Sequence, residues 1–286
     1  MSTTAKTRRR GDWPPAPEPL PLPITDNHTH LDVAAQVLEK PLSTAAWLDQ
    51  ASAVNIHRAV QIGCDLPGAR WTAGIVHEQP GLLGGVALHP NEAPKLAAAN
   101  QLDEALAEIA QLAQIPRIRV VGETGMDTYR TGPEGMEAQR ESFRAHIQLA
   151  KELDLVLQIH DRNAHAEVLE ILKTDGAPKR TVFHCFSGDA EMAQYCADQG
   201  WYLSFAGTVT FKNAGELRRA LAVTPLEQIM VETDAPFLTP HPHRGAPNSS
   251  YLLPHTVRTI AEVLDQPLEA VCERIEATTE AVYGPW

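Results

Sequence analysis

One pattern repeats eight times from residue 24 onward: a short apolar run ends in a polar cluster, and a stretch with helical spacing follows. Successive runs start 21 to 37 residues apart, which leaves room for one strand, one loop and one helix. Strands that alternate with helices form parallel sheets. Eight such units predict an α/β protein whose sheet closes into a (β/α)8 TIM barrel. The runs are residues 24–31, 58–65, 82–90, 119–127, 155–161, 180–188, 201–211 and 229–237.

The segments between the runs carry the signals of helices. Residues 136–153 place Phe143, Ile147 and Ala150 on one face, opposite charged residues. Residues 43–54 open with Ser43, a favourable N-cap. Further helices are predicted over residues 102–112 and, as one helix or a pair, over residues 254–283. An open doubly wound sheet is the alternative fold, but no Gly-x-Gly-x-x-Gly follows the first run.

The repeats indicate a single hydrolase-sized domain over residues 24–286, preceded by a Pro-rich tail. Six prolines stand between Pro14 and Pro23, and we expect residues 1–23 to be extended and disordered. The tail lacks the apolar core of a secretory signal. No apolar run approaches the ~18 residues of a membrane helix, so no membrane partner is expected. Four scattered cysteines without a Cys-x-x-Cys pair predict a reducing, cytoplasmic location.

The net charge constrains the possible partners. The formal charge is −12, and the sequence pI is about 5.4. Proteins that hold long stretches of nucleic acid usually carry a basic face. Any attraction for phosphate must therefore come from bound cations and a few local Arg or Lys residues.

Polar residues with metal-binding side chains stand at the ends of six of the eight runs. The chemistry of such a barrel sits at the C-terminal ends of its strands. In the first run, His28 and His30 are two residues apart, so a strand turns both imidazoles to the same side. Imidazoles and carboxylates together suit zinc, manganese or a related divalent ion. The candidate metal ligands are His28, His30, Glu123, His160, His184 and Asp234.

Six donors favour two cations over one. A single zinc ion needs only about three or four protein ligands. We expect Glu123 to bridge two ions a few ångströms apart, whereas any one of these histidines taken alone fits a hydrogen-bonded core residue equally well. A metal pair activates water and holds both oxygens of an in-line displacement. The predicted reaction is hydrolysis, either of a phosphodiester or of a carboxyl derivative, and the ligand pattern does not choose between them.

Several blocks in fixed order resemble the TatD family of metal-dependent deoxyribonucleases, from about residue 24 to residue 286. The blocks are Asp26-Asn27-His28-Thr29-His30-Leu31, Ala87-Leu88-His89-Pro90, Gly122-Glu123-Thr124-Gly125-Met126-Asp127, His160-Asp161-Arg162, His184-Cys185-Phe186-Ser187-Gly188, residues 203–213, and Glu232-Thr233-Asp234-Ala235-Pro236-Phe237-Leu238.

The resemblance implies an amidohydrolase-like barrel with divalent-metal deoxyribonuclease activity, often as a 3′ exonuclease. One metal would be held by His28, His30, Glu123 and Asp234, and the other by Glu123, His160 and His184. The ions would be Mg²⁺, Mn²⁺ or Zn²⁺. The partner would be DNA, single-stranded or at 3′ ends, with no obligate protein partner.

Further roles follow for residues around these ligands. Asp234 would orient or deprotonate the attacking water, and His89 would protonate the leaving oxygen unless it is only a turn residue before Pro90. Arg162 would clamp a phosphate, or else form a structural salt bridge. Lys212 and Arg244 would contact backbone phosphates, or else be solvated surface charges.

The chain also departs from the family pattern. Asn163 replaces the usual Asp after His-x-Arg, and residues 241–248 lack a basic residue often found there. His241 and His243 form a second His-x-His, but the neighbouring prolines predict a loop without a metal. The weaker basic character leaves a second function open: hydrolysis of an ester, amide or lactone, for example removal of D-amino acids from tRNA.

Overall fold

Parallel strands form a barrel in the computed structural model, which describes residues 12–286. Within these residues, one eight-stranded sheet runs in the order β1 to β8, and each strand pairs in parallel with the next. The predicted (β/α)8 barrel is confirmed. The strands are β1 Ile24–Thr29, β2 Ile56–Gly63, β3 Leu82–Val86, β4 Ile118–Asp127, β5 Val156–Arg162, β6 Thr181–Phe183, β7 Tyr202–Phe205 and β8 Ile229–Val231.

The barrel is nearly closed by a short contact between its first strand and the segment that follows its last. A single parallel bridge joins Thr29 to Ala235. The His30 amide donates to the Ala235 carbonyl at 2.7 Å, and the Asp234 amide donates to the His28 carbonyl at 3.0 Å. The seam therefore lies among predicted metal ligands, so closing the sheet also brings these ligands together.

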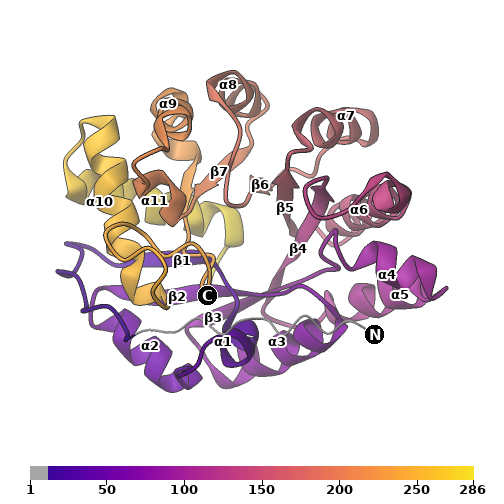
Figure 1. Ribbon diagram of the computed structural model, residues 1–286, viewed down its shortest axis with the longest axis horizontal. Coiled ribbons are helices and arrows are strands. Elements are labelled where there is room, and N and C mark those ends of the chain that lie inside the picture. Colours follow the sequence, from indigo (N-terminus) through magenta and orange to yellow (C-terminus); the bar gives the residue numbers. More distant parts are fainter. Residues whose placement is uncertain (1–11) are drawn as a thin grey trace.

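Helices surround the strands (Figure 1). The predicted helices over residues 43–54, 102–112 and 136–153 are confirmed, and residues 254–283 form a pair of helices. The Ser43 side chain accepts a hydrogen bond from the Ala46 amide, as its N-cap position predicts. The helices are α1 Leu31–Val37, α2 Thr44–Ser52, α3 Leu66–Glu78, α4 Ala93–Ala98, α5 Leu102–Leu112, α6 Met136–Glu152, α7 His165–Asp175, α8 Ala190–Asp198, α9 Gly215–Val223, α10 Leu253–Leu264 and α11 Leu268–Tyr283.

An apolar layer fills the inside of the barrel beneath the polar strand ends. It gathers side chains from six strands, among them Val60, Val182 and Met230. Val282 and Tyr283, at the end of α11, complete this layer. The last helix thus closes one end of the barrel, and the other end is left for the polar clusters.

Two of the apolar runs produce shorter strands than their sequence suggests. The seventh run was predicted over residues 201–211, but β7 ends at Phe205 and a 3₁₀ turn, Gly207–Thr210, follows. The apolar character continues because this turn is itself buried: Val209 is fully covered. The sixth run likewise yields only the three residues of β6.

The prediction of a disordered N-terminal tail is wrong for residues 12–23. This segment has no helix or strand, yet it packs against the barrel. Leu20 is only 1% exposed and belongs to the main apolar core. The Tyr251 hydroxyl donates to the Pro14 carbonyl at 2.7 Å. Proline lacks a donor but keeps its acceptor, so other parts of the chain supply the hydrogen bonds. Residues 1–11 lie outside the described residues.

Within residues 12–286, no helix combines the length and apolar character needed to cross a membrane.

A buried histidine in α6 anchors the loop after β3. His146 accepts a hydrogen bond from the Leu88 amide at 3.3 Å and donates through Nδ1 to the Ser142 carbonyl at 2.7 Å. Burial lowers the pKa of His146 from 6.5 to about 4. The folded protein therefore holds this ring neutral at a pH where the unfolded chain protonates it.

We expect this histidine to make the fold sensitive to acid. As the pH falls from about 6.5 to about 4, the unfolded state binds a proton that the folded state excludes, and the free energy of unfolding falls by up to ~3 kcal/mol. Urea unfolding across this range should show a smaller decline for His146→Gln, whose amide preserves one donor and one acceptor. His57→Gln, at an exposed position, should follow the wild type. Equal declines in all three proteins would contradict the prediction.

Candidate metal centre

All six predicted metal ligands converge at the C-terminal ends of the strands. His28 lies in β1 and His30 follows it directly, and their Nε2 atoms are 3.1 Å apart. Glu123 belongs to β4 and His160 to β5. His184 is the first residue after β6, and Asp234 lies three residues beyond β8. Donors that lie in five strands or just beyond their ends thus meet around one point.

Glu123 stands at the middle of this cluster. Its Oε2 lies 2.8 Å from His184 Nε2 and 3.0 Å from His160 Nδ1. Its Oε1 lies 3.6 Å from His30 Nε2 and accepts a hydrogen bond from the Cys64 thiol at 3.0 Å. The two oxygens therefore face different groups of donors, as a bridging carboxylate requires.

Asp234 faces the histidines of the first strand. Its Oδ1 lies 3.2 Å from His30 Nε2 and 4.0 Å from His28 Nε2. The rings of His28 and His184 stack at 4.0 Å between centroids. The Asp234 side chain is 14% exposed, whereas that of His28 is fully buried, so Asp234 borders the opening of the cluster.

Three overlapping groups of donors are compact enough to hold metal ions, with their donor atoms within 4.8 Å of one another. Glu123 belongs to two of the groups and His28 to two. The groups are His28, His184 and Asp234; His28, His30 and Glu123; and His89, Glu123 and His160. All six predicted ligands take part, and His89 joins them, with its Nε2 4.0 Å from Glu123 Oε1.

The hydrogen bonds behind His28 and His30 turn their Nε2 atoms toward the cluster. His30 Nδ1 donates to the Ile62 carbonyl at 2.9 Å, so Nε2 is the nitrogen that faces the cluster. His28 Nδ1 contacts Gln158 Oε1 at 2.7 Å, and Gln158 Nε2 donates to the Asn27 carbonyl, which fixes the amide orientation. Carbonyl or carboxylate partners of this kind are typical of metal-binding histidines.

The same arrangement holds at His184, whose Nδ1 lies 2.9 Å from Glu232 Oε1. His160 has the opposite orientation: its Nδ1 faces Glu123, and its Nε2 lies 3.4 Å from Asp127 Oδ2. Imidazole nitrogens and carboxylate oxygens are the donors that Zn²⁺ and related divalent ions prefer. The donor set therefore fits divalent metal binding.

Burial and charged neighbours shift the pKa values at the centre in both directions. Burial, together with the neighbouring His184 and His30, holds the pKa of His28 well below its ordinary value of 6.5. Burial alone would raise the pKa of Glu123, but His184 and His89 outweigh it and hold that pKa well below 4.5.

The other three histidines shift the opposite way. Burial would lower the pKa of His30, but Asp234 and Glu123 outweigh it and raise that pKa to about 9. The pKa values of His160 and His184 are also raised, because neighbouring carboxylates outweigh burial. Metals bind neutral imidazole and ionised carboxylate, so a bound cation would displace the extra protons from these histidines.

The predicted phosphate-binding residues lie at the end of β5 and on the loops that follow β7 and β8. Arg162 ends β5, two residues after His160, and its guanidinium lies 4.0 Å from the centre of the Tyr129 ring. Within residues 12–286 it has no ion pair, which disfavours a structural salt bridge. Arg244 is exposed and lies 4.0 Å above the Phe211 ring, and Lys212 is exposed next to it.

The second His-x-His lies in a loop between β8 and α10, as predicted. His243 contacts the ring of His255 at 5.3 Å between centroids. Neither His241 nor His243 belongs to a potential metal-binding group among the residues described by the structure.

Four residues around the centre have contacts that the sequence analysis did not assign. Asp127 and Glu232 are carboxylates inside the recognised blocks, so their burial was the missing information. Gln158 stands two residues before His160, and strand periodicity turns it to the same side. Cys64 directly follows β2, and only the structure places its thiol against Glu123.

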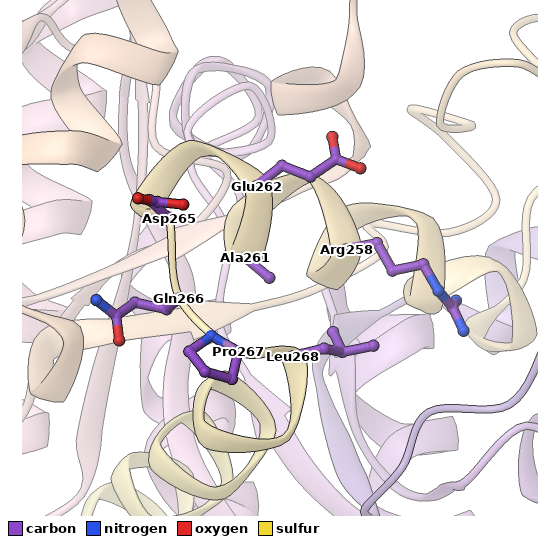
Figure 2. Close-up of a pocket in the computed structure, with 7 residues that line it drawn as sticks. All are labelled: Arg258, Ala261, Glu262, Asp265, Gln266, Pro267 and Leu268. Carbon is purple, nitrogen blue, oxygen red and sulfur yellow. The ribbon is translucent and has the colours of Figure 1, made fainter.

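An open cavity of about 530 Å³ lies elsewhere, between α10 and α11 (Figure 2). Figure 2 shows Arg258 at one end of it and Asp265 with Gln266 at the other. Its lining contains no histidine and no residue of a strand end. This cavity is therefore separate from the metal centre.

A (β/α)8 barrel with clustered imidazoles and carboxylates at its strand ends defines an amidohydrolase-like, metal-dependent hydrolase. A family model described as TatD-related DNase matches residues 25–284. The chain belongs to this family, and it is a TatD-family metal-dependent hydrolase.

Named relatives support this assignment. The metal-dependent hydrolase TatD of Mycobacterium tuberculosis is 42% identical over 265 residues, covering 91% of this chain and 98% of that protein. The metal-dependent hydrolase YabD of Bacillus subtilis is 34% identical, covering 87% and 94%. The crystal structure of the TatD homolog YJJV from Escherichia coli has the same fold, with a TM-score of 0.81, 23% identity and coverage of 92% and 98%.

We expect Glu232 to hold His184 in its metal-binding orientation. Glu232→Gln removes the charge that pairs with Nδ1 and should weaken metal affinity about 10- to 100-fold. Competition against a fluorescent chelator measures this affinity directly. Glu227→Gln makes the same charge change at an exposed position and should bind metal as the wild type does. Unchanged affinity in Glu232→Gln would contradict the assigned role.

Proposed function

We propose that the chain hydrolyses phosphodiester bonds of DNA, as a 3′–5′ exonuclease on single strands or 3′ ends, with two divalent metal ions. The observation that carries the proposal is the position of Glu123 between two groups of donors. One ion would be held by His28, His30, Glu123 and Asp234, and the other by Glu123, His160 and His184. His89 lies within reach of the second group.

The imidazole-rich donor set favours Zn²⁺ or Mn²⁺ on ligand softness, whereas the family resemblance adds Mg²⁺. When bound, two such ions supply an activated water and stabilise the charge on the attacking and leaving oxygens. Side chains of the protein itself would orient the water, donate to the leaving oxygen and bind the phosphate.

Asp234 orients the attacking water and accepts its proton. Its carboxylate borders the opening of the cluster. Its backbone is fixed by the hydrogen bond from its amide to the His28 carbonyl. A carboxylate held at the edge of the cluster meets water without being free to rotate away. This position supports its assignment as the general base.

His89 donates a hydrogen bond to the departing side of the phosphate. Its Nδ1 accepts from the Asn91 amide at 3.0 Å, so the neutral ring carries its hydrogen on Nε2. Nε2 is the atom that faces the cluster. The side chain is 17% exposed, which allows contact with a substrate that enters from the mouth.

Local positive charge compensates for the acidic surface. Arg162 ends β5, and Lys212 and Arg244 lie on the loops that follow β7 and β8, in a chain of net charge −12. Phosphates near the mouth are attracted by these residues and by the bound cations, so no extended basic face is required. This distribution fits a substrate held at few phosphates, such as a strand end.

The acidic charge also favours a second candidate function, the hydrolysis of an ester, amide or lactone, including the removal of D-amino acids from tRNA. The same metals activate water against a carbonyl carbon. The segment 241–248 keeps a single basic residue, Arg244, which weakens the grip on nucleic acid.

The two functions separate in one assay. Purified protein is given Mg²⁺, Mn²⁺ or Zn²⁺ and offered labelled single-stranded DNA, D-aminoacyl-tRNA and simple esters or lactones. We expect release of mononucleotides from DNA, and a loss of about 10³-fold or more in rate in Glu123→Ala, because the shared ligand of both ions is removed. Glu227→Ala serves as the exposed control.

Turnover of the esters or of the aminoacyl-tRNA without nucleotide release would overturn the nuclease proposal in favour of the second function. Nucleotide release that survives in Glu123→Ala would point to a contaminating nuclease.

A further inference from the structure

Tyr129 is an exposed aromatic residue beside the metal centre. Its side chain is 64% exposed. Tyr129 stands two residues after Asp127, and Asp127 Oδ2 lies 3.4 Å from His160 Nε2. Single exposed aromatic residues are common on protein surfaces. Tyr129 differs from such residues in three ways: hydrogen bonds fix its loop, its ring contacts an arginine, and it lies close in the chain to the metal centre.

Hydrogen bonds fix the loop that carries Tyr129. Asp127 Oδ1 accepts from the amides of Tyr129 at 2.9 Å and Arg130 at 2.8 Å. The Thr128 amide donates to the Arg162 carbonyl at 3.1 Å, which extends the pairing of β4 with β5 into the loop. The ring is therefore held on a rigid support attached to the centre.

The partner of Tyr129 is a guanidinium with unused donors. Arg162 lies 4.0 Å from the ring centre, and it has neither a side-chain hydrogen bond nor an ion pair within the part of the chain that the structure describes. Arginine carries five N–H donors that match phosphate geometry. A ring stacked on arginine, with its other side open, offers a base-stacking surface next to a phosphate-binding group.

A second pair of the same kind lies at the same end of the barrel. Arg244 lies 4.0 Å above the ring of Phe211, on the loops that follow β8 and β7. In the strand order β1 to β8, β7 and β8 stand three positions around the barrel from β4 and β5. Two arginine–aromatic pairs thus lie at the end of the barrel that carries the metal centre, a composition typical of surfaces that bind single-stranded nucleic acid.

We infer that Tyr129 stacks on the unpaired base of a nucleotide next to the scissile phosphodiester, while Arg162 binds that nucleotide's phosphate. The inference rests on the proposed nuclease function and adds a base-binding residue to its site. A paired base is stacked inside its duplex and is not free to meet the tyrosine ring.

The test combines a change in the protein with a change in the substrate. Single-stranded oligonucleotides carry either normal bases or abasic residues on both sides of the scissile bond. The chains compared are wild type, Tyr129→Ala, Tyr129→Phe and the control Tyr195→Ala, a tyrosine on the outer helix α8. Cleavage gives kcat and KM, and fluorescence anisotropy with slowly hydrolysed phosphorothioate versions gives Kd.

On normal DNA we expect Tyr129→Ala to raise KM and Kd about tenfold, the size of one lost stacking contact. On abasic DNA the same variant should change them less than about twofold, because no base remains to stack. Tyr129→Phe keeps the ring and should resemble the wild type, as should Tyr195→Ala.

Equal losses on normal and abasic DNA, or no loss on either, would overturn the stacking inference. A wild-type chain that cleaves no DNA with any of the metals would overturn the nuclease proposal instead. The Kd values would then still decide whether Tyr129 recognises a base.

Discussion

Buried carboxylates at the mouth of the barrel are the constraint on which the rest of the structure depends. Glu123 is 5% exposed, and Asp26, Asp127 and Glu232 are fully covered. A carboxylate in such a place is tolerated only when it is paired and hydrogen-bonded. Imidazoles surround Glu123, and amides and hydroxyls surround Asp26. Divalent cations would complete this balance, since they attract the carboxylates and leave the histidines neutral.

The fold holds these groups in place by joining distant parts of the chain. Asp26 accepts hydrogen bonds from the Thr233 amide at 2.9 Å and from the hydroxyls of Thr233 and Ser250, both at 2.6 Å. It thereby ties β1 to the segment that carries Asp234. Tyr283, at the end of the last helix, reaches Gln158, which in turn orients His28. The contacts that close the barrel therefore also position the metal centre.

Much of this arrangement could be predicted from the sequence because it follows from local periodicity. Eight apolar runs gave eight strands, and the spacing of His28 and His30 placed both imidazoles on one side of β1. Contacts that form only in the folded barrel have no such periodic pattern in the sequence. The thiol of Cys64 meets Glu123 only after the barrel has closed, and Leu20 is buried only because the barrel offers it a surface. The strands β6 and β7 are shorter than predicted because the turns that follow them are also apolar and buried. An apolar run in the sequence does not distinguish such a turn from a strand.

Crystals equilibrated with Mn²⁺ or Zn²⁺ provide the most direct measurement of the proposed centre, through the anomalous scattering of the bound ions. We predict two peaks on either side of Glu123, each within ~2.2 Å of imidazole or carboxylate donors from at least three strands. No peak among His28, His160, His184 and Asp234 at saturating metal would contradict a metal-dependent reaction at this site.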